Sequence, residues 1–149
     1  RFTGEPAYFT HVISEGKKLL EKNKLKPSDF AYCVFHMPNG KFPREVAKRL
    51  GFTIDQLAPS LLVDQIGNAY SATTMLALSA VLDIARENQK IFMVSYGSGA
   101  GSDAFVWQTT SALKTLQHAR VKAKLLVRDQ MKKKTYVDYV QFLKMTHKL

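Results

Sequence analysis

The sequence has a single cysteine, Cys33, among 149 residues. One thiol excludes an internal disulfide and any zinc site built from several cysteines of this chain. It also favours a reducing compartment, so we expect a cytoplasmic protein. The four histidines have no metal-ligand spacing, and we predict no metal site. The chain starts at Arg1 without a signal-peptide pattern, and we expect a piece or a processed subunit of a longer protein.

Acidic residues are also few, since 12 Asp and Glu stand against 22 Lys and Arg for a net charge of +10. The excess lies in residues 111–149, where ten basic residues face only Asp129 and Asp138 and account for +8 of the total. Such a basic C-terminal extension suits nucleic acid, an anionic membrane, an acidic partner or plain solvent. No aromatic stacking platform accompanies the lysines at 132–134, so we do not expect nucleic-acid binding.

Charged residues are missing altogether from residues 65–82, a run about long enough to span a bilayer. The Asn, Ser and Thr side chains within it favour a helix buried in protein, and we predict no membrane span. The predicted helix covers residues 69–87 and is apolar on nearly every side. A helix of that kind belongs in the middle of a protein larger than this chain.

The remaining patterns follow the order αβα…αββ without a Pro/Gly/Ser-rich linker, which predicts one α/β domain over residues 1–149. The predicted elements are an amphipathic helix at 5–23, a turn with a 3₁₀ step at 25–30, a strand at 31–36, a basic helix at 44–50, irregular chain with a short helix at 52–66, the helix at 69–87, and strands at 90–97 and 103–110. The stretch "SGAGS" joins the last two strands as a β-hairpin. In the terminal helix, Tyr136, Val140 and Leu143 share a face, which suggests docking.

Two polar residues are candidates for chemistry, and each has a structural alternative. His36 ends the first predicted strand in "FHMPNGKFP" and is either a packed or surface histidine or a neutral imidazole that hydrogen-bonds a carbonyl oxygen. Asn68 precedes the apolar helix and is either its N-cap or an amide donor aimed at a developing oxyanion. Cys33 lies three residues before His36 and points to the opposite face of the strand. We therefore predict a buried structural thiol, without a Cys–His couple.

The glycine-rich stretch "YGSGAGS" is similar to a phosphate-binding loop only in composition. It lacks the Walker lysine, and a strand follows it in place of a helix, so a nucleotide-binding motif is excluded. A tight hairpin that lets the backbone approach a ligand is the better interpretation.

Three stretches taken together resemble a known family: "FHMPNGKFP", "IGNAYSATTMLALSAVLD" and "VSYGSGAGSDAF". In this order and spacing they are similar to the C-terminal half of thiolase-superfamily condensing enzymes, and more narrowly of archaeal-type hydroxymethylglutaryl-CoA synthases. The opening "RFTGEPAYFTHV" and the ending "YVDYVQFLK" extend the resemblance over nearly the whole chain. It implies an α/β thiolase-like fold in which two similar halves stack as five α/β/α/β/α layers, and in which this chain is the C-terminal half.

The resemblance implies condensation of acetyl-CoA with acetoacetyl-CoA to 3-hydroxy-3-methylglutaryl-CoA, for isoprenoid synthesis, with CoA thioesters as substrates and no cofactor. By position, His36 matches the catalytic histidine that polarises the acetoacetyl group, and Asn68 matches an asparagine that holds acyl oxygens. Lys41 matches a lysine near the CoA entrance, and Ser98 a residue of the same cavity. Met37 stands where many relatives have glutamine, which affects the hydrogen bonds behind the histidine.

The family's nucleophilic cysteine and glutamate base have no counterpart in this chain, because Cys33 matches no nucleophile position. The resemblance therefore implies a partner chain that carries both groups, within a homo- or hetero-oligomer, and inactivity without that partner. An acetoacetyl-CoA thiolase and a small zinc-containing OB-fold protein are further partners known in the family. Two alternatives stay open: another acyl-thioester condensing enzyme of the ketoacyl synthase type, and a non-catalytic scaffold that binds CoA or a partner enzyme.

Overall fold

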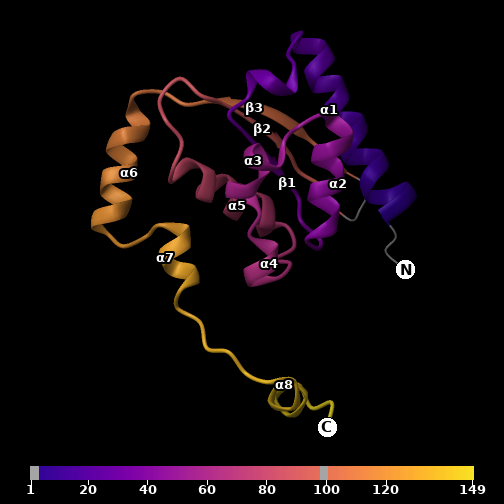
Figure 1. Ribbon diagram of the computed structural model, residues 1–149, viewed down its shortest axis with the longest axis vertical. Helices are drawn as coiled ribbons and strands as arrows, with labels where there is room; N and C mark the ends of the chain where they lie inside the picture. Colours follow the sequence, from indigo (N-terminus) through magenta and orange to yellow (C-terminus); the bar gives the residue numbers. More distant parts are fainter. Residues whose placement is uncertain (1–3, 98–100) are drawn as a thin grey trace.

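The chain folds around a three-stranded mixed sheet, seen in the computed structural model, which describes residues 4–97 and 101–149 (Figure 1). The strands are β1 (Tyr32–Phe35), β2 (Lys90–Val94) and β3 (Ala104–Gln108), in the order β1-β2-β3. β1 runs parallel to β2, with Cys33 opposite Phe92, and β2 runs antiparallel to β3. The predicted strands and the antiparallel pairing of the last two are therefore confirmed, whereas residues 98–100 of the predicted "SGAGS" turn lie outside the described residues.

Helices surround this sheet and connect its strands. In chain order they are the π-helical turn η1 (Gly4–Tyr8), α1 (Phe9–Asn23), the 3₁₀ turn η2 (Pro27–Asp29), α2 (Lys41–Leu50), α3 (Ile54–Leu57), the 3₁₀ turn η3 (Ala58–Ser60), α4 (Val63–Ile66), α5 (Ala72–Leu82), α6 (Ala112–Lys122), α7 (Val127–Met131) and α8 (Tyr139–Met145). Helix α2 ends as predicted at Gly51, whose φ of 87° is readily adopted by glycine.

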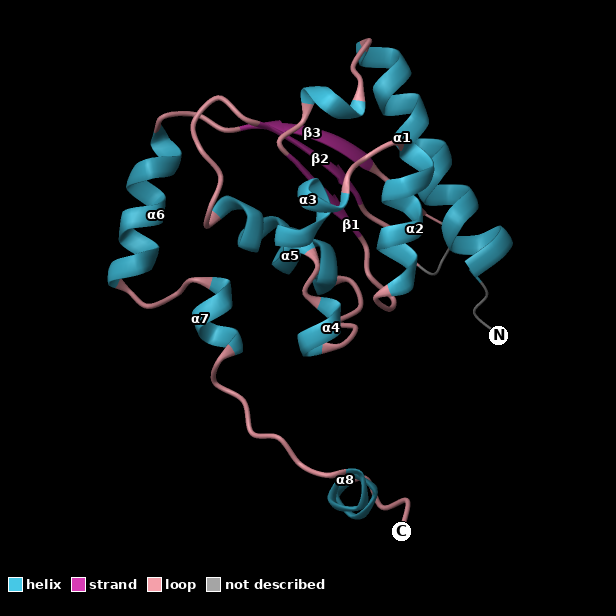
Figure 2. Ribbon diagram, viewed as in Figure 1, coloured by secondary structure: helices cyan, strands magenta, loops and turns pink. Residues whose placement is uncertain are grey.

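Each face of the sheet packs against its own group of helices, as strand alternation requires (Figure 2). The first apolar cluster joins one face to α1 and α2; its members include Val12, Cys33, Phe35, Val46, Leu50 and Phe92. The second joins the other face to α5 and α7; its members include Val34, Ala77, Leu78, Val81, Ile91, Met93 and Val127. The predicted α/β class is confirmed, and Cys33 lies in the first cluster as a fully buried thiol.

Helix α5 is shorter than the predicted 69–87. It starts only at Ala72 because Tyr70 adopts a left-handed backbone with φ of 51°, and it ends at Leu82. Its side chains are not all buried, since Met75 keeps 57% of its surface exposed. The length of this helix was thus overestimated from a continuous apolar pattern. Its exposed apolar side chains agree with the expectation that the helix belongs in the middle of a larger protein.

The tail has a packed part and a free part. Asp83, after α5, holds α6 and α7 because its carboxylate accepts hydrogen bonds from Arg120 Nε at 2.6 Å and from the Val127 backbone N–H at 2.7 Å. Beyond α7 an extended segment leads to α8, which stands apart from the body (Figure 1). Tyr136 is 81% and Val140 53% exposed, so this end does not dock on the described part of the chain, and its docking on another protein stays a prediction.

The length and apolar character of the helices bear on the prediction that the chain has no membrane span. Over residues 4–97 and 101–149, none of them combines the length and the apolar character that crossing a bilayer requires. The uncharged run 65–82 is divided among α4, a turn and α5, which explains why it forms no long apolar helix.

Candidate functional site

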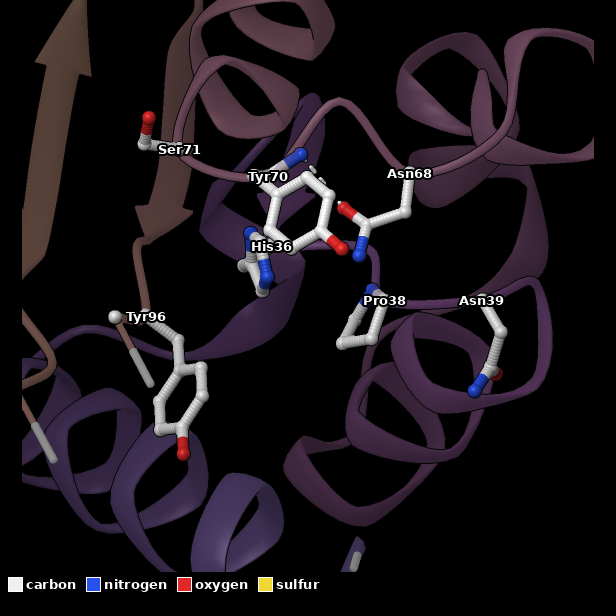
Figure 3. Close-up of a pocket in the computed structure, with 8 residues that line it drawn as sticks. His36, Pro38, Asn39, Asn68, Tyr70, Ser71 and Tyr96 are labelled. Carbon is white, nitrogen blue, oxygen red and sulfur yellow. Dashed lines mark hydrogen bonds between the residues drawn. The ribbon is translucent and has the colours of Figure 1, made fainter. Parts of the chain in front are cut away.

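A cavity of about 550 Å³ opens at the carboxyl ends of β1 and β2 (Figure 3). Two segments form its opposing walls: residues 36–41, called here the His36 loop, and residues 67–71, called the Asn68 turn. The residues that line it are His36, Pro38, Asn39, Asn68, Tyr70, Ser71, Tyr96 and Gly97. Two of the four residues predicted for the site, His36 and Asn68, therefore meet at one cavity.

His36 is held by its backbone on both sides. Its N–H donates to the Val94 carbonyl at 3.1 Å, which continues the β1–β2 ladder by one residue. Its own carbonyl accepts a hydrogen bond of 2.6 Å from the hydroxyl of Tyr8, a residue that is completely buried. The rings of Tyr8 and Tyr96 flank the imidazole with centroids 6.3 and 5.9 Å away. The strand end thus fixes the histidine while the loop after it opens the cavity.

The imidazole of His36 is only 7% exposed, and burial lowers its pKa below the ordinary value of 6.5. The ring is therefore neutral at pH 7, with one nitrogen as an N–H donor and the other as an acceptor. Its Nδ1 atom is buried and has no hydrogen-bond partner within the described part of the chain. A neutral imidazole at a cavity wall can bind and polarise a carbonyl oxygen without bringing in a full charge.

Asn68 stabilises the turn before α5, but the predicted N-cap role is wrong, because Ser71 is the N-cap residue of this helix. Gly67, with φ of 73° and ψ of −171°, provides a turn for which glycine is suited. The Asn68 Oδ1 then accepts from the Tyr70 N–H at 2.8 Å and from the Thr73 hydroxyl at 3.2 Å, so the oxygen ties the turn to the first residues of α5. This bonding assigns the amide orientation and directs the Nδ2 group into the cavity between Tyr70 and Pro38 (Figure 3). Asn68 therefore holds the turn with its oxygen and offers an N–H₂ donor to the cavity.

The other two predicted residues are not brought to the cavity lining. Lys41 is the first residue of α2, and its side chain is exposed. Its backbone N–H and that of Phe42 donate to Asn39 Oδ1 at 2.9 and 3.1 Å, so Asn39 serves as the cap of this helix. Ser98 lies outside the described residues.

Cys33 and the side chains that could bind a metal ion are the remaining candidates for chemistry at the site. The Cys33 thiol is fully buried against the opposite face of the sheet, and burial raises its pKa strongly. A protonated, enclosed thiol is a poor nucleophile. Throughout residues 4–97 and 101–149, no group of three or more His, Cys, Asp and Glu side chains is arranged to hold a metal ion.

Sequence reasoning missed Tyr8, Tyr70 and Tyr96, three aromatic residues that surround the candidate pair. Tyr96 ends the apolar run "KIFMVSY", so the end of a buried strand could have indicated it. Tyr8 lies 28 residues before His36, and no local pattern links the two. Tyr70 was included in a helix that begins only after it.

Comparison with known proteins identifies the family. Residues 20–109 match the model of the 3-oxoacyl-[acyl-carrier-protein (ACP)] synthase III C-terminal family. The chain belongs to this family. All 149 residues also align, with 48% identity, to a hydroxymethylglutaryl-CoA synthase from Methanopyrus kandleri, so the resemblance to archaeal synthases is confirmed. The chain covers 41% of that relative, and about two-fifths of the other curated relatives that it matches.

Solved structures agree with the family on the fold. An HMG-CoA synthase from Bacillus subtilis superposes with a TM-score of 0.66 at 18% identity, over 88% of this chain and 38% of the other. A 3-oxoacyl-(acyl carrier protein) synthase III from Pseudomonas aeruginosa PAO1 superposes with a TM-score of 0.65 at 20% identity, over 74% and 35%. The predicted thiolase-like α/β fold, with this chain as one half-domain, is confirmed.

Proposed function

We propose that this chain is the acceptor-binding part of a hydroxymethylglutaryl-CoA synthase, which condenses acetyl-CoA with acetoacetyl-CoA. The observation that carries the proposal is the meeting of a neutral His36 and the Asn68 amide at one cavity. Both offer N–H donors to the carbonyl oxygens of a thioester. The alignment to an archaeal synthase, at 48% identity, supports this substrate class, because it covers all 149 residues. It therefore includes the tail after residue 109, where the match to the acyl-carrier-protein synthase family ends.

In the proposed reaction a cysteine outside this chain carries the acetyl group, and a carboxylate outside this chain removes a proton from its methyl. The resulting carbanion attacks the ketone carbon of acetoacetyl-CoA, and a proton converts the ketone oxygen to the 3-hydroxyl. Water then cleaves the cysteine thioester and releases the product. Hydrogen bonds from His36 and Asn68 to the acceptor oxygens stabilise the charge that develops on the ketone oxygen. The buried Cys33 does not serve as the nucleophile, so another segment or subunit completes the site.

The second candidate is condensation of a malonyl thioester, as in 3-oxoacyl-[acyl-carrier-protein] synthases. The family match over residues 20–109 favours it, and the cavity would present the same two donors to that substrate. The two candidates differ in the substrate that reacts, so substrate profiling separates them.

The test uses a full-length hybrid in which these 149 residues replace the aligned segment of the Methanopyrus kandleri relative. We expect the hybrid to release CoA from acetyl-CoA and acetoacetyl-CoA together. His36→Ala should lower the condensation rate by roughly one-hundred-fold or more, whereas His118→Ala, an exposed histidine on α6, should leave it unchanged. Reaction with malonyl thioesters but not acetoacetyl-CoA would establish the second candidate. An unaffected His36→Ala hybrid would point to a non-catalytic scaffold.

A further inference from the structure

The two walls of the cavity come from segments far apart in the sequence, and one side chain joins them. Arg44, on α2, donates from Nη1 to the Gly40 carbonyl at 2.6 Å, which lies in the His36 loop. The same guanidinium donates from Nη2 to Asp64 Oδ2 at 2.6 Å, and Asp64 lies on α4 immediately before the Asn68 turn. A second, longer bond of 3.4 Å runs from Nη1 to Asp64 Oδ1. Arg44 therefore bridges both walls.

Gly40 lies directly beside the Arg44–Asp64 ion pair. Its φ of −68° and ψ of −21° are ordinary helical values, so the backbone itself does not require glycine. A Cβ at this position would overlap Asp64 Oδ1 and come within 2.7 Å of Arg44 Nη1. A methyl group here would therefore displace the Asp64 carboxylate and the Arg44 guanidinium from their present contact.

On each side of the bridge, a short segment with backbone hydrogen bonds connects the ion pair to one residue of the candidate pair. On one side Asn39 caps α2 and ties the His36 loop to the helix that carries Arg44. On the other side the Gly67 N–H donates to the Val63 carbonyl at 2.9 Å, so the turn is bonded to the helix that carries Asp64. A change in the Arg44–Asp64 contact would therefore change the separation of the two walls.

We propose that Arg44 is a positioning residue, which clamps the His36 loop to α4 and thereby sets the spacing between His36 and Asn68. The inference rests on the proposed function, because that spacing matters for an acceptor held by both residues. Both side chains of the pair are 44% exposed, and an ion pair of that exposure adds little to global stability. We expect the ion pair to act on the positions of His36 and Asn68, because a displacement of about 1 Å in a binding group can lower the reaction rate many-fold.

The test compares three clamp variants with a matched control in the hybrid enzyme. Arg44→Gln and Asp64→Asn remove the charges, and Gly40→Ala displaces the carboxylate without altering either. Arg49→Gln is the control, because Arg49 is on the same helix and forms ion pairs with Glu45 and Glu5 at similar exposure, away from the cavity.

We expect the clamp variants to lower kcat/KM for acetoacetyl-CoA roughly ten-fold or more while acetyl-enzyme formation stays within about two-fold of the unmodified hybrid. Hydrogen exchange of residues 66–73 should accelerate in the same variants, in the hybrid and in the 149-residue chain alone. Arg49→Gln should change neither quantity. Rescue of kcat/KM by Arg44→Lys, which retains one bond to Asp64, should be partial.

Three results would overturn the inference: unchanged kcat/KM in the clamp variants, an equal loss of acetyl-enzyme formation, or the same loss in Arg49→Gln. The last two would indicate general loss of folding. If the unmodified hybrid does not condense its substrates, the proposed function fails, and hydrogen exchange alone then decides on the clamp. Faster exchange at residues 66–73 only in the clamp variants supports it, and unchanged exchange refutes it.

Discussion

Substitution of Tyr8 by phenylalanine removes one oxygen atom from the support of His36. The Tyr8 side chain is completely buried, and its hydroxyl is 2.6 Å from the His36 carbonyl oxygen. Its ring packs edge-on against Phe9 and Tyr96, with centroids 5.3 and 5.4 Å away. Because phenylalanine keeps this ring, Tyr8→Phe isolates the hydrogen bond from the packing.

The expected loss follows from the burial of the bond. Removing the donor leaves a buried carbonyl without this partner, which costs about 1 to 3 kcal/mol of unfolding free energy. No cavity term adds to it, since the ring remains. In a domain of this size each 1 kcal/mol lowers Tm by about 2 to 4 °C. Burial raises the pKa of the Tyr8 hydroxyl well above its usual range, so the donor stays protonated and the loss should not vary between pH 6 and 9.

Urea unfolding followed by far-UV circular dichroism measures this loss. Tyr32→Phe is the control, because Tyr32 is half-buried at the start of β1 and its hydroxyl makes no hydrogen bond within the described chain. We expect the control to be within about 0.5 kcal/mol of the unmodified chain. Equal midpoints for Tyr8→Phe and Tyr32→Phe would refute the argument that the Tyr8 hydroxyl anchors His36.

Three further outcomes are expected. Burial lowers the pKa of His36, so below pH 6.5 the unfolded chain takes up a proton that the folded chain resists. The unfolding free energy, measured by urea titration at each pH, should therefore decrease as the pH is lowered below 6.5, and it should decrease less in His36→Gln. Cys33 should react with iodoacetamide only in step with global unfolding, because its thiol is buried and its pKa raised. Asn68→Ala should lose about 1 kcal/mol of unfolding free energy, because Oδ1 no longer bonds the turn before α5, and Asn68→Asp should lose much less. Both should lose acetoacetyl-CoA condensation in the hybrid, and retained activity in Asn68→Asp would exclude the amide donor.

Local patterns predicted those parts of the site that depend on neighbours in the sequence. The strand that ends before His36 follows from a short apolar run closed by a Pro-Asn-Gly turn. The end of α2 follows from Gly51, and the place of Asn68 in a turn beside the cavity follows from its position between Gly67 and an apolar helix. In each of these cases a few adjacent residues determine the backbone, and the backbone determines where the side chain lies.

Long-range contacts account for what the patterns did not reveal. The Tyr8 hydroxyl bonds a carbonyl 28 residues away, and Arg44 bonds a carboxylate 20 residues away. Hydrophobic periodicity places Tyr8 on an apolar helix face but cannot name its hydrogen-bond partner. The length of helix α5 was overestimated for a different, local reason, since Tyr70 adopts a left-handed backbone in the turn that Asn68 stabilises.

The chemistry of the cavity explains why the proposed reaction needs more protein than this chain. Among the described residues, those lining the cavity include no thiol and no carboxylate. The nearby carboxylate of Asp64 is bonded to Arg44, and the Cys33 thiol faces the other side of the sheet. What remains are hydrogen-bonding groups, above all the His36 imidazole and the Asn68 amide. Such groups can hold and polarise a carbonyl, but carbon–carbon bond formation also requires a nucleophile and a base, which in the proposed reaction come from protein outside this chain.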